Sequence, residues 1–340
     1  ACYDLADQGK SFKAELDAIK ARYQEIIDGL QLDLDLSEEF GTIEKNFKAK
    51  SGSNYAASRG EYLNGIIMAN YLGYDFIDAA TVIFFDENGE FDAAKTNEVL
   101  RARLAESKEA VVPGFYGSMP DGTVKTFSRG GSDITGSIVA KAAKADVYEN
   151  WTDVSGFLVT DPRIVENPVP IETITYKELR ELAYMGASVL HEDAIFPVRR
   201  EGIPINIRNT NNPSHPGTII ALDAPRDTGT PTITGIAGRK GFSVISVEKA
   251  MMNSELGFGR RVLTVLEEEG ISFEHLPTGI DTMCVVVAGD ALAGKRERVI
   301  NRIIELVAPD VVTIHDDMSI IATVGRGMVH NCGTAARLFS

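Results

Sequence analysis

The spacing of hydrophobic residues in the first part of the chain predicts helices. Apolar residues recur at helical spacing from Ala1 to Leu30, and we expect two helices there. A polar, acidic connector that includes Ser37 and Glu38 follows. A third helix is predicted from Ser58 to Leu72, because its apolar residues share one face.

From Phe76 onward, short runs rich in β-branched and aromatic residues alternate with helical segments. The predicted strands are 81–85, 110–114, 146–151 and 204–208, and the predicted helices are 93–106, 132–144 and 176–185. Strands that alternate with helices are typical of an α/β domain with a largely parallel sheet.

A segment dense in Asn, Pro, Gly, Asp and Thr, from Asn209 to Gly229, reads as a connector, and we place a domain boundary near Thr232. Beyond it the predicted elements are strand 242–248, helix 257–268, strands 271–276 and 283–288, helix 295–307 and strand 311–315. This βαββαβ order is that of a ferredoxin-like unit. A strand at 319–324 and a helix at 333–339 then start a second such unit. The predicted domains are therefore 1–232, 233–317 and the beginning of another at 318–340.

The bulk composition narrows the classes of function. The chain has 340 residues and a formal net charge of −15, which disfavours nucleic acid and anionic membrane surfaces as partners. Its cysteines, Cys2, Cys284 and Cys332, lack the spacing of metal ligands or redox pairs, so a reducing, cytosolic setting is expected. Neither a long apolar run nor a signal sequence is present, which predicts a soluble protein. The start, without methionine and inside a helical pattern, reads as the edge of a fragment.

The first candidate for chemistry is the turn from Phe127 to Asp133, which precedes a predicted helix. Gly130 and Gly131 permit a tight turn with exposed amides, and a helix N-terminus favours an anion. Arg129 adds a planar donor group suited to a carboxylate or phosphate. The alternative is a plain glycine turn in which Ser132 or Asp133 caps the helix.

The second candidate is the segment from Trp151 to Arg163. Thr152 and Asp153 follow a predicted strand, and ligands of open α/β sheets gather beyond the carboxyl ends of strands. The alternative is a polar hairpin with Asp161 and Pro162 in an ordinary turn.

Together these segments resemble the aspartate kinase branch of the amino-acid kinase family. Further matches occur in order at Ser58–Glu61, Gly186–His191 and Arg208–Pro213, and the similarity extends over nearly the whole chain. The resemblance implies a three-layer α/β/α kinase domain of the carbamate-kinase-like fold, followed by tandem ACT domains.

The resemblance also implies an activity: transfer of the γ-phosphoryl group of ATP, with Mg²⁺, to the side-chain carboxylate of L-aspartate. The product would be 4-phospho-L-aspartate, the first step toward lysine, threonine and methionine. An aspartate side chain is already ionised at neutral pH, since its reference pKa is about 3.9, so no general base is needed. Catalysis then consists of positioning and charge neutralisation.

Site residues follow from the matching motifs. Arg129 would bind the substrate α-carboxylate within the Gly130–Asp133 turn, and Glu61 and Asp133 would face its ammonium group. The residues expected at the nucleotide are Thr152, Asp153, Leu158, Asp161 and Arg163. For Glu61 the alternative is a capping box with Ser58, which could compete with the substrate role.

Two departures from the family pattern affect the expected activity. Leu158 replaces a tyrosine usual at the nucleotide site, and the family's Lys-Phe-Gly-Gly phosphate loop with its catalytic lysine does not occur in this sequence. We therefore expect this chain by itself to transfer phosphate poorly. His191, followed by Glu192, is read as structural, and the Gly325–Gly327 segment as a strand-to-helix turn.

By the same resemblance, an amino-acid effector, expected to be lysine, would bind between paired ACT units. The residues expected there are Met252, Ser254, Gly257, Phe258, Ser272 and Glu274. Such pairing would make a homodimer or a higher homo-oligomer. Two alternatives stay open: an amino-acid kinase acting on another substrate such as glutamate, and a non-catalytic amino-acid sensor that retains the kinase scaffold.

Overall fold

The structure is a computed structural model that describes residues 1–128, 130–186, 196–223, 232–326, 328 and 331–340. The chain separates into two compact units. The first contains Ala1–Leu158, Val169–Arg180 and the described residues of 188–230, and the second contains Val159–Pro168 and the described residues of 181–187 and 231–340.

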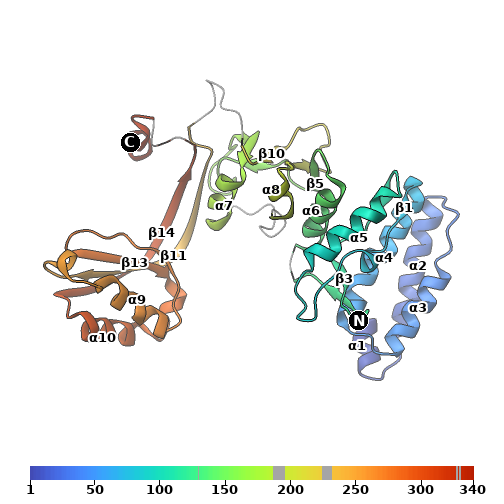
Figure 1. The fold of residues 1–340 in the computed structure, drawn as a ribbon, viewed down its shortest axis with the longest axis horizontal. Helices are drawn as coiled ribbons and strands as arrows, with labels where there is room; N and C mark the ends of the chain where they lie inside the picture. The colour runs from blue at the N-terminus through green and yellow to red at the C-terminus, as the bar shows by residue number, and fades with distance from the viewer. Residues whose placement is uncertain (129, 187–195, 224–231, 327, 329–330) are drawn as a thin grey trace. The chain divides into compact units, whose positions relative to one another are not determined.

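The first unit begins with four helices, seen side by side in blue in Figure 1. They are α1 (Cys2–Asp7), α2 (Lys13–Gly29), α3 (Ser37–Lys48) and α4 (Ser53–Leu72). Their apolar faces form one core that includes Phe12, Leu16, Phe40, Phe47 and Leu63. Residues 31–36 form a connector as expected, but Ser37 and Glu38 already belong to helix α3, which was not predicted.

The rest of the first unit is an α/β arrangement, as predicted. In chain order its elements are β1 (Asp75–Phe76), η1 (Ala79–Thr81), α5 (Ala93–Ala105), β2 (Ala110–Val111), β3 (Tyr116–Ser118), β4 (Val124–Thr126), α6 (Gly131–Ala143), β5 (Tyr148–Thr152), β6 (Phe157–Leu158), β7 (Pro170–Ile171), β8 (Thr173–Thr175), α7 (Tyr176–Tyr184), α8 (Phe196–Glu201), β9 (Ile205–Asn209) and β10 (Thr218–Ala221).

The main sheet of this unit has the strand order β5-β9-β10-β8. Strands β5 and β9 are parallel, as are β10 and β8, whereas β9 and β10 are antiparallel. Strands β1 and β2 form a separate parallel pair, and β3–β4 and β6–β7 are antiparallel pairs. Helix α6 packs against both α5 and α8, and it carries the turn that the sequence singled out.

The strand predicted at 81–85 was wrong. The segment opens with the 3-10 turn η1, in which the Asp78 carboxylate accepts a hydrogen bond from the Ala80 amide at 3.0 Å. Phe84 and Phe85 make only isolated bridges. Their hydrophobic run reflects burial beneath helices, since Val82 and Ile83 are buried in the core.

The second unit contains the predicted βαββαβ order. Its elements are β11 (Gly235–Glu248), η3 (Met252–Ser254), α9 (Phe258–Glu268), β12 (Phe273–His275), β13 (Thr282–Ala288), η4 (Gly289–Leu292), α10 (Arg296–Val307), β14 (Val311–Val324) and α11 (Thr334–Phe339). The antiparallel sheet has the order β12-β13-β11-β14, which confirms the ferredoxin-like unit. Helices α9 and α10 cover one face of it (Figure 1).

Strands β11 and β14 are longer than predicted. They pair from Gly235 opposite Val324 to Glu248 opposite Val311, with register shifts around Phe242. The strand expected separately at 319–324 is the second half of β14, paired with the first half of β11.

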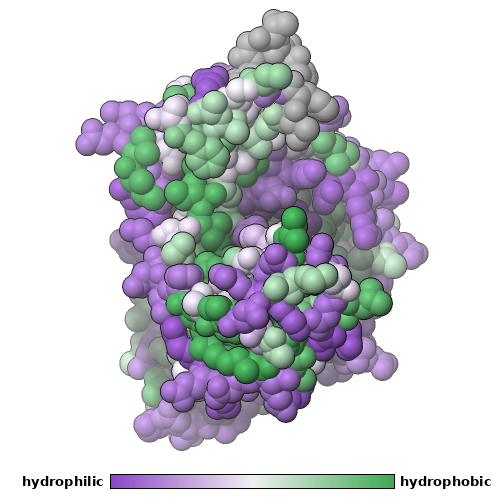
Figure 2. All heavy atoms as spheres, turned by 90° about the vertical axis from the view of Figure 1, so that its left-hand side faces the viewer, coloured by the Kyte–Doolittle hydropathy of each residue, from purple (hydrophilic) through white to green (hydrophobic). Residues whose placement is uncertain are grey.

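The surface agrees with the charged composition. Figure 2 shows a side that is mostly hydrophilic, with smaller hydrophobic patches between polar side chains. Among the described residues, no helix has the length and apolar character needed to cross a membrane.

Candidate functional site

The turn before helix α6 has the backbone that its glycines predict. Gly130 adopts a left-handed conformation with φ of 57°, immediately before the helix. A Cβ on Gly131 would lie 2.9 Å from the Phe115 Cα atom and 3.0 Å from the Phe127 Cβ atom, so only glycine fits this approach. The helix begins at Gly131, which places Ser132 and Asp133 inside its first turn. The alternative in which either one caps the helix was therefore wrong. Arg129 lies outside the described residues.

The same turn is held from within the helix by Thr135. Its hydroxyl donates to the Gly131 carbonyl at 2.7 Å and accepts from the Phe115 amide at 3.1 Å. The amides of the first turn of a helix have no intrahelical acceptor, and the helix dipole makes this end favourable for a negative group. Ser132 is exposed there, so the turn can receive an anion.

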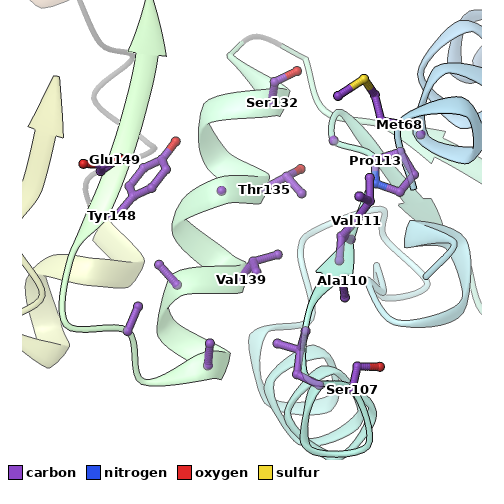
Figure 3. Close-up of a pocket in the computed structure, with 18 of the residues that line it drawn as sticks. Met68, Ser107, Ala110, Val111, Pro113, Ser132, Thr135, Val139, Tyr148 and Glu149 are labelled. Atoms are coloured by element: carbon purple, nitrogen blue, oxygen red, sulfur yellow. The ribbon is translucent and has the colours of Figure 1, made fainter. Parts of the chain in front are cut away.

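Glu61 and Ser132, the latter from this turn, line one cavity, which has a volume of about 710 Å³. Its wall comes from α4, α5, β2, α6 and β5, and Figure 3 shows Ser132, Thr135 and Val139 along α6 opposite Val111 and Pro113. Glu61 and Ser132 both belong to it although they lie far apart in the sequence. Gly136, Tyr148 and Glu149 complete it on the β5 side.

The capping-box interpretation of Glu61 was wrong. Helix α4 starts at Ser53, after Gly52, so Ser58 lies inside the helix and cannot be its cap. The buried Ser58 hydroxyl instead donates to the Tyr55 carbonyl at 2.8 Å. Glu61 is exposed and has no competing role at a helix terminus.

Asp133 has partners that sequence reasoning missed. Its Oδ1 atom accepts a hydrogen bond from Nδ2 of Asn150 at 2.9 Å, and its backbone carbonyl accepts one from the Tyr148 hydroxyl at 3.2 Å. Burial raises the pKa of Tyr148 to about 12, so the hydroxyl stays protonated at neutral pH. The available signal was an asparagine two residues after a tyrosine in a predicted strand, where both side chains face the same side.

The residues predicted at the nucleotide fall into both units. In the first unit, the Thr152 hydroxyl donates to the Asp153 carboxylate at 3.3 Å, and the Thr152 carbonyl accepts from the Thr210 amide at 2.8 Å. Both residues lie at the carboxyl end of β5, where the sequence placed them. Leu158 lies in β6 with 37% of its surface exposed.

In the second unit, Asp161 and Arg163 form an ion pair, with Nη2 of Arg163 2.6 Å from Oδ2 of Asp161. Hydrogen bonding from Arg163 lowers the pKa of Asp161. The amides of Ile164 and Val165 both donate to the Asp161 carbonyl, so this residue also starts a turn. The Arg163 side chain is exposed and could exchange this partner for a phosphate.

The six predicted effector residues have differing surroundings. Met252 and Phe258 are buried in the core of the second unit. The Ser254 hydroxyl donates to the Met251 carbonyl at 2.8 Å, Gly257 takes a left-handed conformation before α9, and Ser272 is exposed. Glu274 accepts a hydrogen bond from the Tyr184 hydroxyl and lies 3.5 Å from Nη2 of Arg239. A cationic effector at Glu274 would have to share it with these two groups.

We tested whether the chain offers a site for the Mg²⁺ that accompanies ATP. Within the described ranges, no three His, Cys, Asp or Glu side chains are grouped so that they could hold a metal ion. Mg²⁺ that is bound together with a nucleotide needs only one or two protein carboxylates beside the phosphates, so we assign no particular residue to it.

Comparison with known proteins places the chain in a family. Residues 13–209 match the amino acid kinase family. Aspartokinase 3 of Bacillus subtilis (strain 168) is 39% identical over 336 residues, which cover 94% of this chain and 74% of that protein.

Solved structures agree with this. The crystal structure of Clostridium acetobutylicum aspartate kinase, described as an allosteric enzyme, is 51% identical with a TM-score of 0.86, over 99% of this chain and 77% of that one. E. coli aspartokinase III, solved in complex with aspartate and ADP, is 24% identical with a TM-score of 0.65, over 96% of this chain and 77% of that one, and supports the fold alone. The chain therefore belongs to the amino acid kinase family and, within it, to the aspartokinases.

Proposed function

We propose that this protein phosphorylates the side-chain carboxylate of L-aspartate with ATP, forming 4-phospho-L-aspartate and ADP. The observation that carries the proposal is that Glu61 and Ser132, from separate segments, line one cavity, which runs along α6 and includes Ser132 of its first turn. An acidic side chain and free helix amides are complementary to the ammonium and carboxylate groups of an amino acid.

Substrate binding follows from these charges. Arg129 and the amides of the α6 turn would hold the α-carboxylate, while Glu61 and Asp133 would face the ammonium group. The side-chain carboxylate is then left as the nucleophile, and it needs no base because it is ionised at neutral pH. Holding it in line with the γ-phosphate accounts for a large part of the rate enhancement.

The nucleotide would be bound by Thr152, Asp153, Leu158, Asp161 and Arg163. The position of Thr152 and Asp153 at the carboxyl end of β5 supports this assignment. Arg163 would exchange its pairing with Asp161 for a phosphate oxygen. Leu158 offers an apolar contact but no ring for stacking against adenine.

Regulation is proposed to act through the ferredoxin-like unit, with lysine as the effector near Met252, Ser254, Gly257, Phe258, Ser272 and Glu274. The resemblance to a structure described as an allosteric enzyme supports regulation in general. The lysine site, the pathway, a homodimer formed through these units, the domain limits and a cytoplasmic location remain predictions.

The proposal is tested by hydroxamate formation, which traps an acyl phosphate. ATP should support hydroxamate formation with aspartate but not with glutamate, and lysine should reduce it. The assay is run on this chain and on a version extended with the Lys-Phe-Gly-Gly loop of aspartokinases. Activity with glutamate alone would show a different kinase, and inactivity of both versions would favour an amino-acid sensor.

The Arg129→Ala variant tests the substrate assignment within the same assay. Removing the guanidinium should abolish turnover of aspartate, because the α-carboxylate loses its cation, while ATP affinity stays within about twofold. Fluorescence titration with a nucleotide analogue measures the second quantity. Loss of nucleotide binding in the variant would show that the turn binds phosphate instead.

A further inference from the structure

The carboxylate of Asp133 is oriented by a neutral donor. Asn150 on β5 is buried, with 8% of its surface exposed, and its Nδ2 atom lies 2.9 Å from Oδ1 of Asp133. The same Nδ2 atom lies 2.9 Å from the Tyr148 hydroxyl, so both of its hydrogens have acceptors. No described residue donates a hydrogen bond to Oδ2 of Asp133, although the carboxylate can accept several.

Tyr148 completes a closed network on the same face of β5. Its hydroxyl accepts from Asn150 and donates to the Asp133 carbonyl at 3.2 Å. Figure 3 shows its ring between β5 and α6, beside the first turns of the helix. A Cβ on Gly136 would lie 2.6 Å from the Tyr148 oxygen, so the glycine permits this close contact. The backbone and the side chain of Asp133 are thus both tied to β5.

The chemistry of this donor matters for what Asp133 can bind. A lysine or arginine at position 150 would neutralise the carboxylate, whereas an amide occupies one oxygen and leaves the negative charge in place. Fixing Oδ1 on β5 determines which way Oδ2 points. An ammonium group is attracted to a carboxylate that keeps its charge and has a free oxygen.

We propose that Asn150 is a positioning residue that orients Asp133 toward the substrate ammonium group and thereby sets the preference for an amino acid over a dicarboxylate without an amino group. The inference rests on the proposed function, in which Asp133 faces that ammonium. Asn150 itself does not touch the substrate.

The test compares the affinities of two ligands, L-aspartate and succinate, which lacks the amino group. Isothermal titration calorimetry on the full chain gives both dissociation constants for the unsubstituted protein and for Asn150→Leu. Without the orienting hydrogen bond, Asp133 should lose most of its charged hydrogen bond to the substrate ammonium group, which weakens aspartate binding by about 10- to 100-fold. Succinate should change by less than about twofold, since it makes no contact that depends on Asp133.

Asn206→Leu is the matched control. Asn206 is a buried asparagine on the adjacent strand β9, where it pairs with Glu149, and it makes no hydrogen bond to Asp133. Its replacement should leave the ratio of the two affinities unchanged. The thermal melting curve shows whether Asn150→Leu folds. If it does not, Asn150→Ser gives the same comparison, because the serine side chain is too short for its hydroxyl to reach Oδ1 of Asp133.

The outcomes separate this inference from the proposed function. Unchanged aspartate affinity in the Asn150 variant, or equal weakening of aspartate and succinate, would overturn the positioning role while leaving the function intact. Failure of the unsubstituted chain to bind aspartate would overturn both. Weaker binding of aspartate but not of succinate, in the Asn150 variant and not in the Asn206 variant, would support the positioning role.

Discussion

At the scale of single residues, sequence motifs predicted the backbone correctly where steric contact allows only one residue type. They failed where the residues on either side changed the local structure. Gly130 and Gly131 were recognised because a left-handed residue and a close backbone approach both demand glycine. The Ser58–Glu61 capping box failed because the preceding residues 53–57 continue the helix. A capping motif has meaning only where a helix begins.

Gly136 gives the first stability prediction. Replacing it with alanine puts a Cβ 2.7 Å from two ring carbons of Tyr148, so the ring or helix α6 must move. We expect a loss of about 1–3 kcal/mol in the free energy of unfolding. Urea denaturation followed by circular dichroism measures it.

Gly41→Ala is the control for the Gly136 variant. Gly41 lies in helix α3 with nothing within 4 Å of an added Cβ, and its φ is ordinary. This substitution should be neutral or stabilise the protein by up to about 1 kcal/mol. Equal destabilisation by both substitutions would mean that contact with Tyr148 is not the cause.

At the scale of elements, hydrophobic periodicity predicted helices well and their ends less well. Helices α5, α9 and α10 were predicted to within one residue at each end because each has a continuous apolar face. Helix α3 was missed because its first residues are acidic, yet Asp35 accepts hydrogen bonds from both the amide and the hydroxyl of Ser37 and marks its start. Strand β11 was predicted too short because its first half is polar and glycine-containing.

Helix α10 offers a paired test of its buried face. Ile303 is fully buried against the sheet of the second unit, whereas 48% of the surface of Ile304 is exposed. Ile303→Ala should cost about 2–5 kcal/mol of unfolding free energy through lost contacts and the remaining cavity. Ile304→Ala should cost less than about 1 kcal/mol. If urea denaturation showed comparable losses of unfolding free energy in the two variants, the orientation of this helix would be contradicted.

At the scale of the whole molecule, the net charge follows from the sequence alone, whereas the expected domain limits stay a prediction. The inclusion of 159–168 and 181–187 in the second unit was not visible, because these segments lie between strands and helices of the first unit in the sequence.

Buried tyrosines predict loss of stability at high pH. Burial raises the pKa of Tyr148 and of Tyr176 to about 12, from an unfolded value of 10.0. Between these values the unfolded chain loses the protons and the folded chain keeps them, so the free energy of unfolding falls as pH rises from 10 to 12. Each group contributes about 2–3 kcal/mol to that fall.

Urea midpoints at pH 8 and at pH 11 test this effect. In Tyr148→Phe, the urea midpoint should decrease less between pH 8 and pH 11, since the variant has no phenol to ionise at that position. The control is Tyr71→Phe, because 55% of the surface of Tyr71 is exposed. A fall of the same size in Tyr148→Phe as in the unsubstituted chain would contradict the prediction.

The sequence by itself determined the fold class, the βαββαβ order of the second unit and the turn before α6, because these depend on periodicity and on glycine geometry that neighbouring residues encode. It also carried the motifs that identify an aspartokinase. Only the tertiary structure decided that Glu61 and Ser132 line one cavity and that Asn150 holds Asp133. Contacts between strands and helices distant in sequence depend on packing and register, which no local pattern specifies.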